Sequence, residues 1–254
     1  MGDSSNYYLE QFRRALVVTK KNIKIYYSKG SVLIFGIIFP LFLFLAFFIG
    51  RNLSIVDALP GLLGMTVFFT ATSVGPTIIP FEVRSRTLER LVSSPINLWT
   101  IFFGDMLSSF LFGFIISLIP LIIGVFIGIS IINYALILSG VFLGTLCFSA
   151  LSILLSAYPP SDTPSTIMMI SSLVRFPLVF ISGVFIPISA LPSWGVIISS
   201  ISPLTYFVDL ARYAVVGVSY YPIALDLSVL IFAAILFFVV AVSIHKKTLL
   251  SRFS

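Results

Sequence analysis

The chain has 254 residues, of which 59% are hydrophobic and only 9% are charged, and its net charge is +6. Because an ordinary globular domain carries roughly 25% charged residues, this composition excludes a water-soluble protein and predicts that lipid surrounds most of the chain. The basic residues lie at the ends of apolar runs, which argues against a nucleic-acid partner and favours anionic lipid headgroups.

The first predicted element is a helix over residues 5–29 that lies in the plane of the membrane. On a helical wheel, one arc collects Tyr8, Phe12, Ala15, Leu16, Thr19, Ile23 and Tyr26. The adjacent arc collects the cations Arg13, Arg14, Lys20, Lys21 and Lys24, with Val17 as the apolar exception. Such a helix places aromatic side chains among the headgroups and cations toward anionic lipid. A disordered basic tail is the alternative.

Six apolar runs follow, and each is long enough to cross the hydrocarbon core, which takes about 20 helical residues. They cover residues 31–50, 58–81, 99–129, 133–157, 165–187 and 223–244. The third run is over-long, so its first turns are expected at the membrane interface. The predicted fold class is therefore an all-α integral membrane protein, built as a single domain over residues 1–254 with six transmembrane helices.

The loop at residues 82–98, between the second and third runs, concentrates charge. It holds Glu82, Arg84, Arg86, Glu89 and Arg90 within one short segment. We expect a cytoplasmic loop with a short helix, placed where a soluble partner can push on it. The alternative is that these charges only solvate a loop and fix the topology.

Arg175 is the one basic residue inside a predicted span. An ionisable residue at this depth is costly, and it indicates either a substrate pathway or a buried partner. The other interpretation is that its long side chain extends back to the cytoplasmic headgroups. If Arg175 faces the pathway, an anionic group such as a lipid phosphate or an acidic sugar is the expected ligand.

Residues 188–222, before the last span, are largely apolar but are interrupted by prolines. Because proline breaks a continuous helix, we expect two short helices that enter the outer leaflet and return. Irregular backbone at membrane depth is tolerated only against protein or a water-filled cavity. This outer re-entrant region is therefore expected to pack on the other spans or on a second subunit.

The basic residues also predict the orientation. Six of the 15 precede the first span, three lie in the loop after the second span, and three lie in the tail. These three groups are Arg13, Arg14, Lys20, Lys21, Lys24 and Lys29; Arg84, Arg86 and Arg90; and Lys246, Lys247 and Arg252. Only Arg51 and Arg212 fall on the other side. The positive-inside rule then places both termini in the cytoplasm of a multi-pass protein of the cell membrane.

Sequence motifs for catalysis or nucleotide binding are missing. The chain has no G-x-x-x-x-G-K-[ST] motif for nucleotide phosphates, no H-E-x-x-H and no G-x-S-x-G. Its single cysteine, Cys147, excludes an internal disulfide and a cysteine-based metal site. We therefore expect no catalytic residues, cofactor or metal site in this chain.

Two segments resemble the membrane subunits of type-2 ABC exporters. The first runs from Glu82 through Arg84, Ser85, Arg86, Thr87, Leu88, Glu89, Arg90 and Leu91 to Ser94, Pro95 and Trp99. The second contains Ser182, Gly183, Pro187, Leu191, Pro192, Trp194, Ser202, Pro203, Tyr206, Asp209 and Arg212. Two departures stand out: the family often has glycine where this chain has Arg86, and an arginine such as Arg175 is not expected in the fifth span.

The resemblance implies a division of labour. A separate ABC ATPase would bind ATP and Mg²⁺, while this chain and a second membrane subunit, most simply an identical copy, would form the path for a drug, a lipid or a glycan. It also implies a dimer interface on the first, second and fifth spans. In the family the short helix of the first cytoplasmic loop docks in a groove of the ATPase. Here the docking face would comprise Arg84, Thr87, Leu88 and Leu91, flanked by Arg86, Glu89 and Arg90.

A self-contained secondary transporter is the alternative function. Such a transporter usually has intramembrane carboxylates for ion coupling and visible internal repeats. Asp105 is the one candidate near a span interior, and the two halves of the chain are not visibly similar. Glu82, at the membrane edge, is instead expected to pair with a basic residue of the amphipathic helix.

Overall fold

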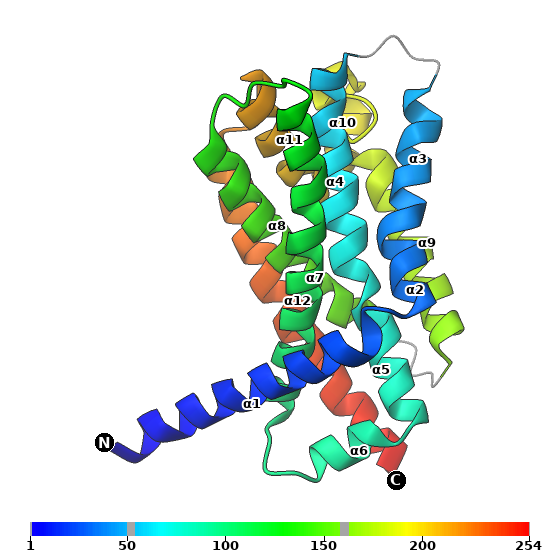
Figure 1. Ribbon diagram of the computed structural model, residues 1–254, viewed down its shortest axis with the longest axis vertical. Coiled ribbons are helices and arrows are strands. Elements are labelled where there is room, and N and C mark those ends of the chain that lie inside the picture. Colours follow the sequence, from blue (N-terminus) through cyan, green and yellow to red (C-terminus); the bar gives the residue numbers. More distant parts are fainter. Residues whose placement is uncertain (1, 50–53, 158–162, 254) are drawn as a thin grey trace.

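The computed structural model describes residues 2–49, 54–157 and 163–253 and is a bundle of long helices (Figure 1). Within these residues, six helical segments are long and apolar enough to cross a membrane. They are Gly30–Phe47, Ile55–Arg84, Leu98–Phe126, Tyr134–Leu155, Pro164–Ile181 and Ile223–Thr248. The predicted fold class and number of spans are thereby confirmed. Arg51, which the charge pattern placed on the outer side, lies outside the described residues.

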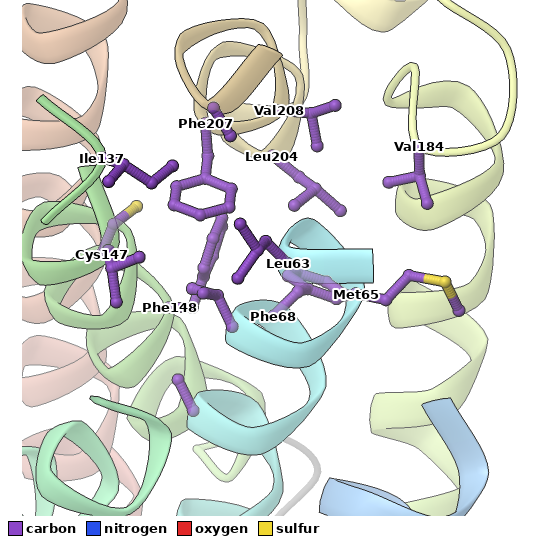
Figure 2. Close-up of a cluster of buried hydrophobic side chains, with 14 of the residues drawn as sticks. Leu63, Met65, Phe68, Ile137, Cys147, Phe148, Val184, Leu204, Phe207 and Val208 are labelled. Carbon is purple, nitrogen blue, oxygen red and sulfur yellow. The ribbon is translucent and has the colours of Figure 1, made fainter. Parts of the chain in front are cut away.

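The second span forms the centre of the bundle, since 89% of its most apolar 18-residue stretch is buried. Its first part is α4 (Ile55–Ser73), whose N-terminal turn is capped by the Ser54 hydroxyl, which accepts a hydrogen bond from the Asp57 N–H. Aromatic rings join α4 to its neighbours: Phe68 meets Phe148 edge-on, with ring centroids 5.0 Å apart (Figure 2). This core fixes the positions of the elements around it.

The second span bends where α4 passes into α5 (Gly75–Arg84). The Gly75 N–H donates a hydrogen bond to the Ser152 hydroxyl of a different helix, at 2.9 Å. This bond ties the bend to α8 (Tyr134–Leu155). A side chain at position 75 would meet the Ser152 carbonyl at 2.7 Å, which explains the glycine. Beyond the bend, α5 carries the charged segment to the end of the bundle.

The first span also departs from a regular helix. It consists of α2 (Gly30–Leu33), a π-helical turn η1 (Ile34–Ile38) and α3 (Phe39–Phe48). Pro40 lacks an N–H, so the preceding turn loses its regular hydrogen bond and widens. Gly36, in this turn, allows close contact with Ser73 of α4.

The amphipathic helix α1 (Gly2–Tyr26) extends obliquely across one end of the bundle (Figure 1). Its inner stripe, which includes Ala15, Val18 and Asn22, is buried against α7 (Leu98–Phe126). Tyr8, Phe12 and Leu16 are exposed beside the cations, as an interfacial helix requires. Val17, the exception on the helical wheel, is exposed too.

The re-entrant region consists of η2 (Ile188–Ala190), α10 (Ser193–Ser199) and α11 (Pro203–Val216). The axes of α10 and α11 differ by 105°, so together they form a bent helical pair, as predicted. The helix α11 packs on α4 and α8, and Figure 2 shows Leu204 and Phe207 pointing into that core. Gly144 of α8 allows the contact, because a side chain there would meet the Phe207 ring at 2.6 Å.

Two span boundaries differ from the predicted ones. The fifth span, α9 (Pro164–Ile181), ends before Gly183, which takes a left-handed φ of 72° and turns the chain, so it does not reach Pro187. The last helix, α12 (Ile223–Phe253), continues far past residue 244. Both termini lie at the same end of the bundle as α1 (Figure 1), and we call this the terminal end.

Candidate functional site

The charged segment forms a short helix, α6 (Thr87–Val92), at the terminal end of the bundle (Figure 1). It follows α5 after a tight turn in which Arg86 adopts a left-handed conformation, with φ of 55° and ψ of 20°. Residues with a Cβ rarely adopt this conformation, whereas glycine adopts it freely. The turn thus explains why glycine is common at this place in the sequences that the segment resembles.

The leucines of α6 face the chain itself. Leu88 is 2% exposed and belongs to a core cluster with Tyr26, Ile101 and Phe102. Leu91 is half-buried against the same cluster. The sequence predicted that these leucines would enter a groove on a partner, but the core of this chain already covers Leu88.

The charged side chains of the segment remain on the surface. Arg84, Arg86, Glu89 and Arg90 are all exposed, while Thr87 is half-buried. The turn beneath them is held by hydroxyl groups: Ser85 donates to the Phe81 carbonyl at 2.7 Å, and Thr87 donates to the Glu82 carbonyl at 3.3 Å. The exposed surface of the segment is therefore a patch of mixed charge that is fixed to the end of α5.

Glu82 links α5 to α1. Its carboxylate is fully buried and forms an ion pair with the Lys21 ammonium, whose side chain is 28% exposed. The predicted pairing of Glu82 with a basic residue of the amphipathic helix is confirmed. At the other end of the charged loop, the Arg14 guanidinium donates to the Pro95 carbonyl. Helix α1 is thus attached to both ends of the loop.

A second set of polar contacts joins α1 to α7. The Asn22 amide donates to the Asp105 carboxylate at 2.6 Å, and the Thr19 hydroxyl donates to the Gly104 carbonyl at 3.0 Å. Asp105 is fully buried in this contact. Burial raises the pKa of the Tyr26 phenol, and the Glu82 and Asp105 carboxyls raise it further. Helices α1, α5, α6 and the start of α7 consequently form one cross-linked unit, which we call the coupling unit.

Sequence reasoning missed the contribution of Asn22 and of Gln11, which accepts a hydrogen bond from the Thr100 hydroxyl at 2.8 Å. A signal was present. Gln11, Ala15, Val18 and Asn22 recur at helical spacing and form one stripe, and its polar members carry no charge. A stripe of uncharged polar residues is suited to hydrogen bonding inside a protein.

Arg175 is buried within the bundle with a relative exposure of 0%. Its guanidinium points back along α9, because Nε donates to the Ser171 carbonyl at 3.3 Å and Nη2 donates to the Ser172 hydroxyl at 3.2 Å. The side chain thus extends toward the terminal end, as a headgroup-directed arginine would, yet it remains enclosed by protein. The role of Arg175 in a substrate pathway stays a prediction.

The residues of the second predicted motif shape the bent pair at the other end. Pro187 and Pro192 directly precede η2 and α10, and Pro203 is the first residue of α11, since proline fits the start of a helix. The Tyr206 hydroxyl donates to the Ser200 carbonyl at 2.9 Å and closes the corner, while Trp194 is exposed. Together with Gly183 these residues position the backbone of the bent pair, and the Tyr206 ring packs on that of Tyr221, with ring centroids 5.1 Å apart.

The fold and the site define a multi-pass membrane protein with a cross-linked, charged unit at one end. Residues 13–216 match the family model described as ABC-2 type transporter. The chain belongs to this family and is the permease-type membrane component of an ABC transporter. It is also similar to "Putative transport permease ycf38" of Cyanophora paradoxa, with 31% identity over 158 residues. The match covers 61% of this chain and 53% of that relative, so it spans about half of the relative's length.

Proposed function

We propose that this chain is the membrane subunit of an ATP-driven exporter and that a separate ABC ATPase drives it. The observation that carries the proposal is the exposed charged patch of α6, which is joined rigidly to the second span and, through Lys21 and Glu82, to α1. A force applied to this patch would reach the centre of the bundle. ATP and Mg²⁺ would be held by the partner, because the sequence has no phosphate-binding loop.

The terminal end would lie in the cytoplasm, where ATP is available. In support, both termini and α6 share that end, and 12 of the basic residues belong to the three segments found there, as counted along the sequence. The exposed apolar residues of α1, beside its cations, would rest among the lipid headgroups of the cell membrane.

A second membrane subunit, most simply an identical copy, would complete the translocation path. The first and fifth spans have exposed surface that a second subunit could cover. Only 17% and 33% of their most apolar 18-residue stretches are buried, respectively. Phe42 of α3 and Leu173 of α9 are each about two-thirds exposed, at 65% and 67%. The second span, which the resemblance also assigned to the interface, is enclosed by its own chain and offers little surface.

The substrate would be hydrophobic or amphipathic: a drug, a lipid or a glycan carried on a lipid. The exposed faces of the first and fifth spans carry large apolar side chains and would open toward lipid or toward a second subunit. Such a substrate would reach the path from within the bilayer.

The test is purification of the tagged chain from native membranes in mild detergent, with identification of bound proteins and an assay of ATP hydrolysis. We expect a stoichiometric partner with a phosphate-binding loop. Charge reversal at exposed positions of α6, Glu89→Lys with Arg90→Glu, should remove the partner and stop transport, while insertion and abundance stay normal. Lys247→Glu, an exposed reversal on α12, is the matched control and should leave the partner bound.

The proposed coupling site is refuted if the double reversal leaves both partner binding and transport intact. A preparation that transports substrate without any such ATPase would instead favour the secondary transporter. Leu88→Asp is not a suitable variant, because Leu88 lies in the core and a charge there would disturb folding.

A further inference from the structure

A cavity of about 650 Å³ lies between the start of the first span and α9. Its walls are mostly apolar and include Phe35, Phe81 and Leu173. Lys29 stands at its edge, with its ammonium 5.3 Å from the centre of the Phe81 ring. Among the described residues that line the cavity, none is acidic. Its volume suits a small amphipathic molecule, since ligand sites commonly enclose about 300–1,000 Å³.

Arg175 lies directly behind this wall. Two residues that line the cavity, Met168 and Ser172, also contact its guanidinium, and a third, Phe35, has its ring centre 5.8 Å from the guanidinium carbon. A single layer of side chains therefore separates the cation from the cavity. Because the contacts lie three and seven residues before Arg175 on α9, the charge is displaced toward the same end as Lys29.

The charge of Arg175 has no acidic partner in the described part of the chain. Its acceptors are neutral: the Ser171 carbonyl, the Ser171 and Ser172 hydroxyls and the Met168 sulfur. Its Nη1 atom is buried and has no hydrogen-bond partner. A buried charge that lacks an ion partner is costly, and such residues in membrane spans usually mark a ligand or a pathway. The site is built to accept an anion.

We propose that this cavity binds the phosphate-type headgroup of an anionic amphiphile, with Arg175 as its inner cation and Lys29 as its outer cation. The planar guanidinium suits phosphate oxygens, and Nη1 would become the donor when the layer of side chains between it and the cavity moves aside as the headgroup binds. The apolar tail would lie along the exposed side of α9 at Met169 and Leu173. The inference rests on the transport function proposed above and names its substrate class.

The experiment measures binding to the full-length chain in nanodiscs of phosphatidylcholine, without ATP, so it can be read even if no ATPase is found. The probe is a photoreactive phosphatidic acid, and the matched control is the diacylglycerol with identical chains. We expect the phosphatidic acid to label α9 and the start of the first span, and the diacylglycerol to bind at least about tenfold more weakly. Inorganic phosphate alone should not displace the lipid, because it gains nothing from the apolar walls.

Arg175→Gln should weaken the binding of phosphatidic acid at least about tenfold, which is the loss expected when a charge-assisted hydrogen bond is removed. Arg175→Lys should recover part of the lost affinity. Lys29→Glu, at a half-buried surface position, should weaken binding similarly and is the informative variant if Arg175→Gln does not fold. Lys246→Glu, an exposed control, should have no effect.

Three results would overturn the proposal. Unchanged binding in both Arg175→Gln and Lys29→Glu would exclude the two cations. Equal binding of the diacylglycerol would exclude headgroup recognition. Displacement by inorganic phosphate at the same concentration as the lipid would show a free-anion site.

Discussion

The ion pair between Lys21 and Glu82 should hold the coupling unit together, and its strength can be measured. Lys21 is the one side chain that the described part of the chain offers to the Glu82 carboxylate, whose second oxygen has no partner. Removing Lys21 would leave a fully buried charge uncompensated. Removing Glu82 would leave an ammonium on a side chain that is 28% exposed and can still reach water.

The two single substitutions should therefore differ in cost. Lys21→Met should lower the free energy of unfolding by about 3–5 kcal/mol, as when one partner of a buried pair is lost. Glu82→Gln should cost about 1 kcal/mol, since a neutral hydrogen bond can persist. The double variant leaves no charge at this contact and should cost roughly 2 kcal/mol, so the coupling energy is about 2–4 kcal/mol.

The assay is unfolding of the purified chain in mixed micelles titrated with dodecyl sulfate, followed by circular dichroism for the wild type, both single variants and the double variant. Lys20→Met, at an exposed neighbouring position on α1, controls for the loss of one positive charge. If the two single effects add to within about 0.5 kcal/mol, the pair contributes no specific stability and the reasoning fails.

The same titration tests two further predictions. Arg86→Gly should stabilise the chain by about 1 kcal/mol, because the left-handed turn at φ 55° strains a residue with a Cβ; a less stable variant would show that the Arg86 side chain makes a compensating contact. Gly144→Ala should cost about 1–3 kcal/mol, because its Cβ would lie 2.6 Å from the Phe207 ring. Gly195→Ala is the control, since its nearest neighbour would be at 3.4 Å, and equal effects at both positions would contradict close packing of α11 on α8.

Much of the fold could be predicted because its signals are local. The length of an apolar run identifies a span, and the prolines and Gly183 mark where the chain must turn. The pairing of Glu82 followed from the cost of a carboxylate at the membrane edge. The bend at Gly75 was not predicted, since it depends on a hydrogen bond to Ser152 from a helix far along the sequence.

The direction of the α6 leucines shows a different limit. Helical spacing indicates which residues share a face, but it does not say whether that face meets the same chain or a partner. Leu88 is buried because α1, α5 and α7 converge on it at the terminal end. Likewise, the depth of Arg175 along the sequence could not reveal that its guanidinium turns back by one to two helical turns and stays enclosed.

Helix α5 connects the two sites. Phe81 and Glu82 are neighbours near its end: Phe81 lines the cavity beside α9, and Glu82 holds α1. A displacement of α6 must carry both residues with it, because the turn at Arg86 leaves no flexible linker between α6 and α5. A push on the charged patch would consequently move a wall of the cavity and the attachment of α1 in one step. In this arrangement the ATPase would alter the anion site without contacting it, and the Lys21 to Glu82 pair would decide how much of the motion α1 shares.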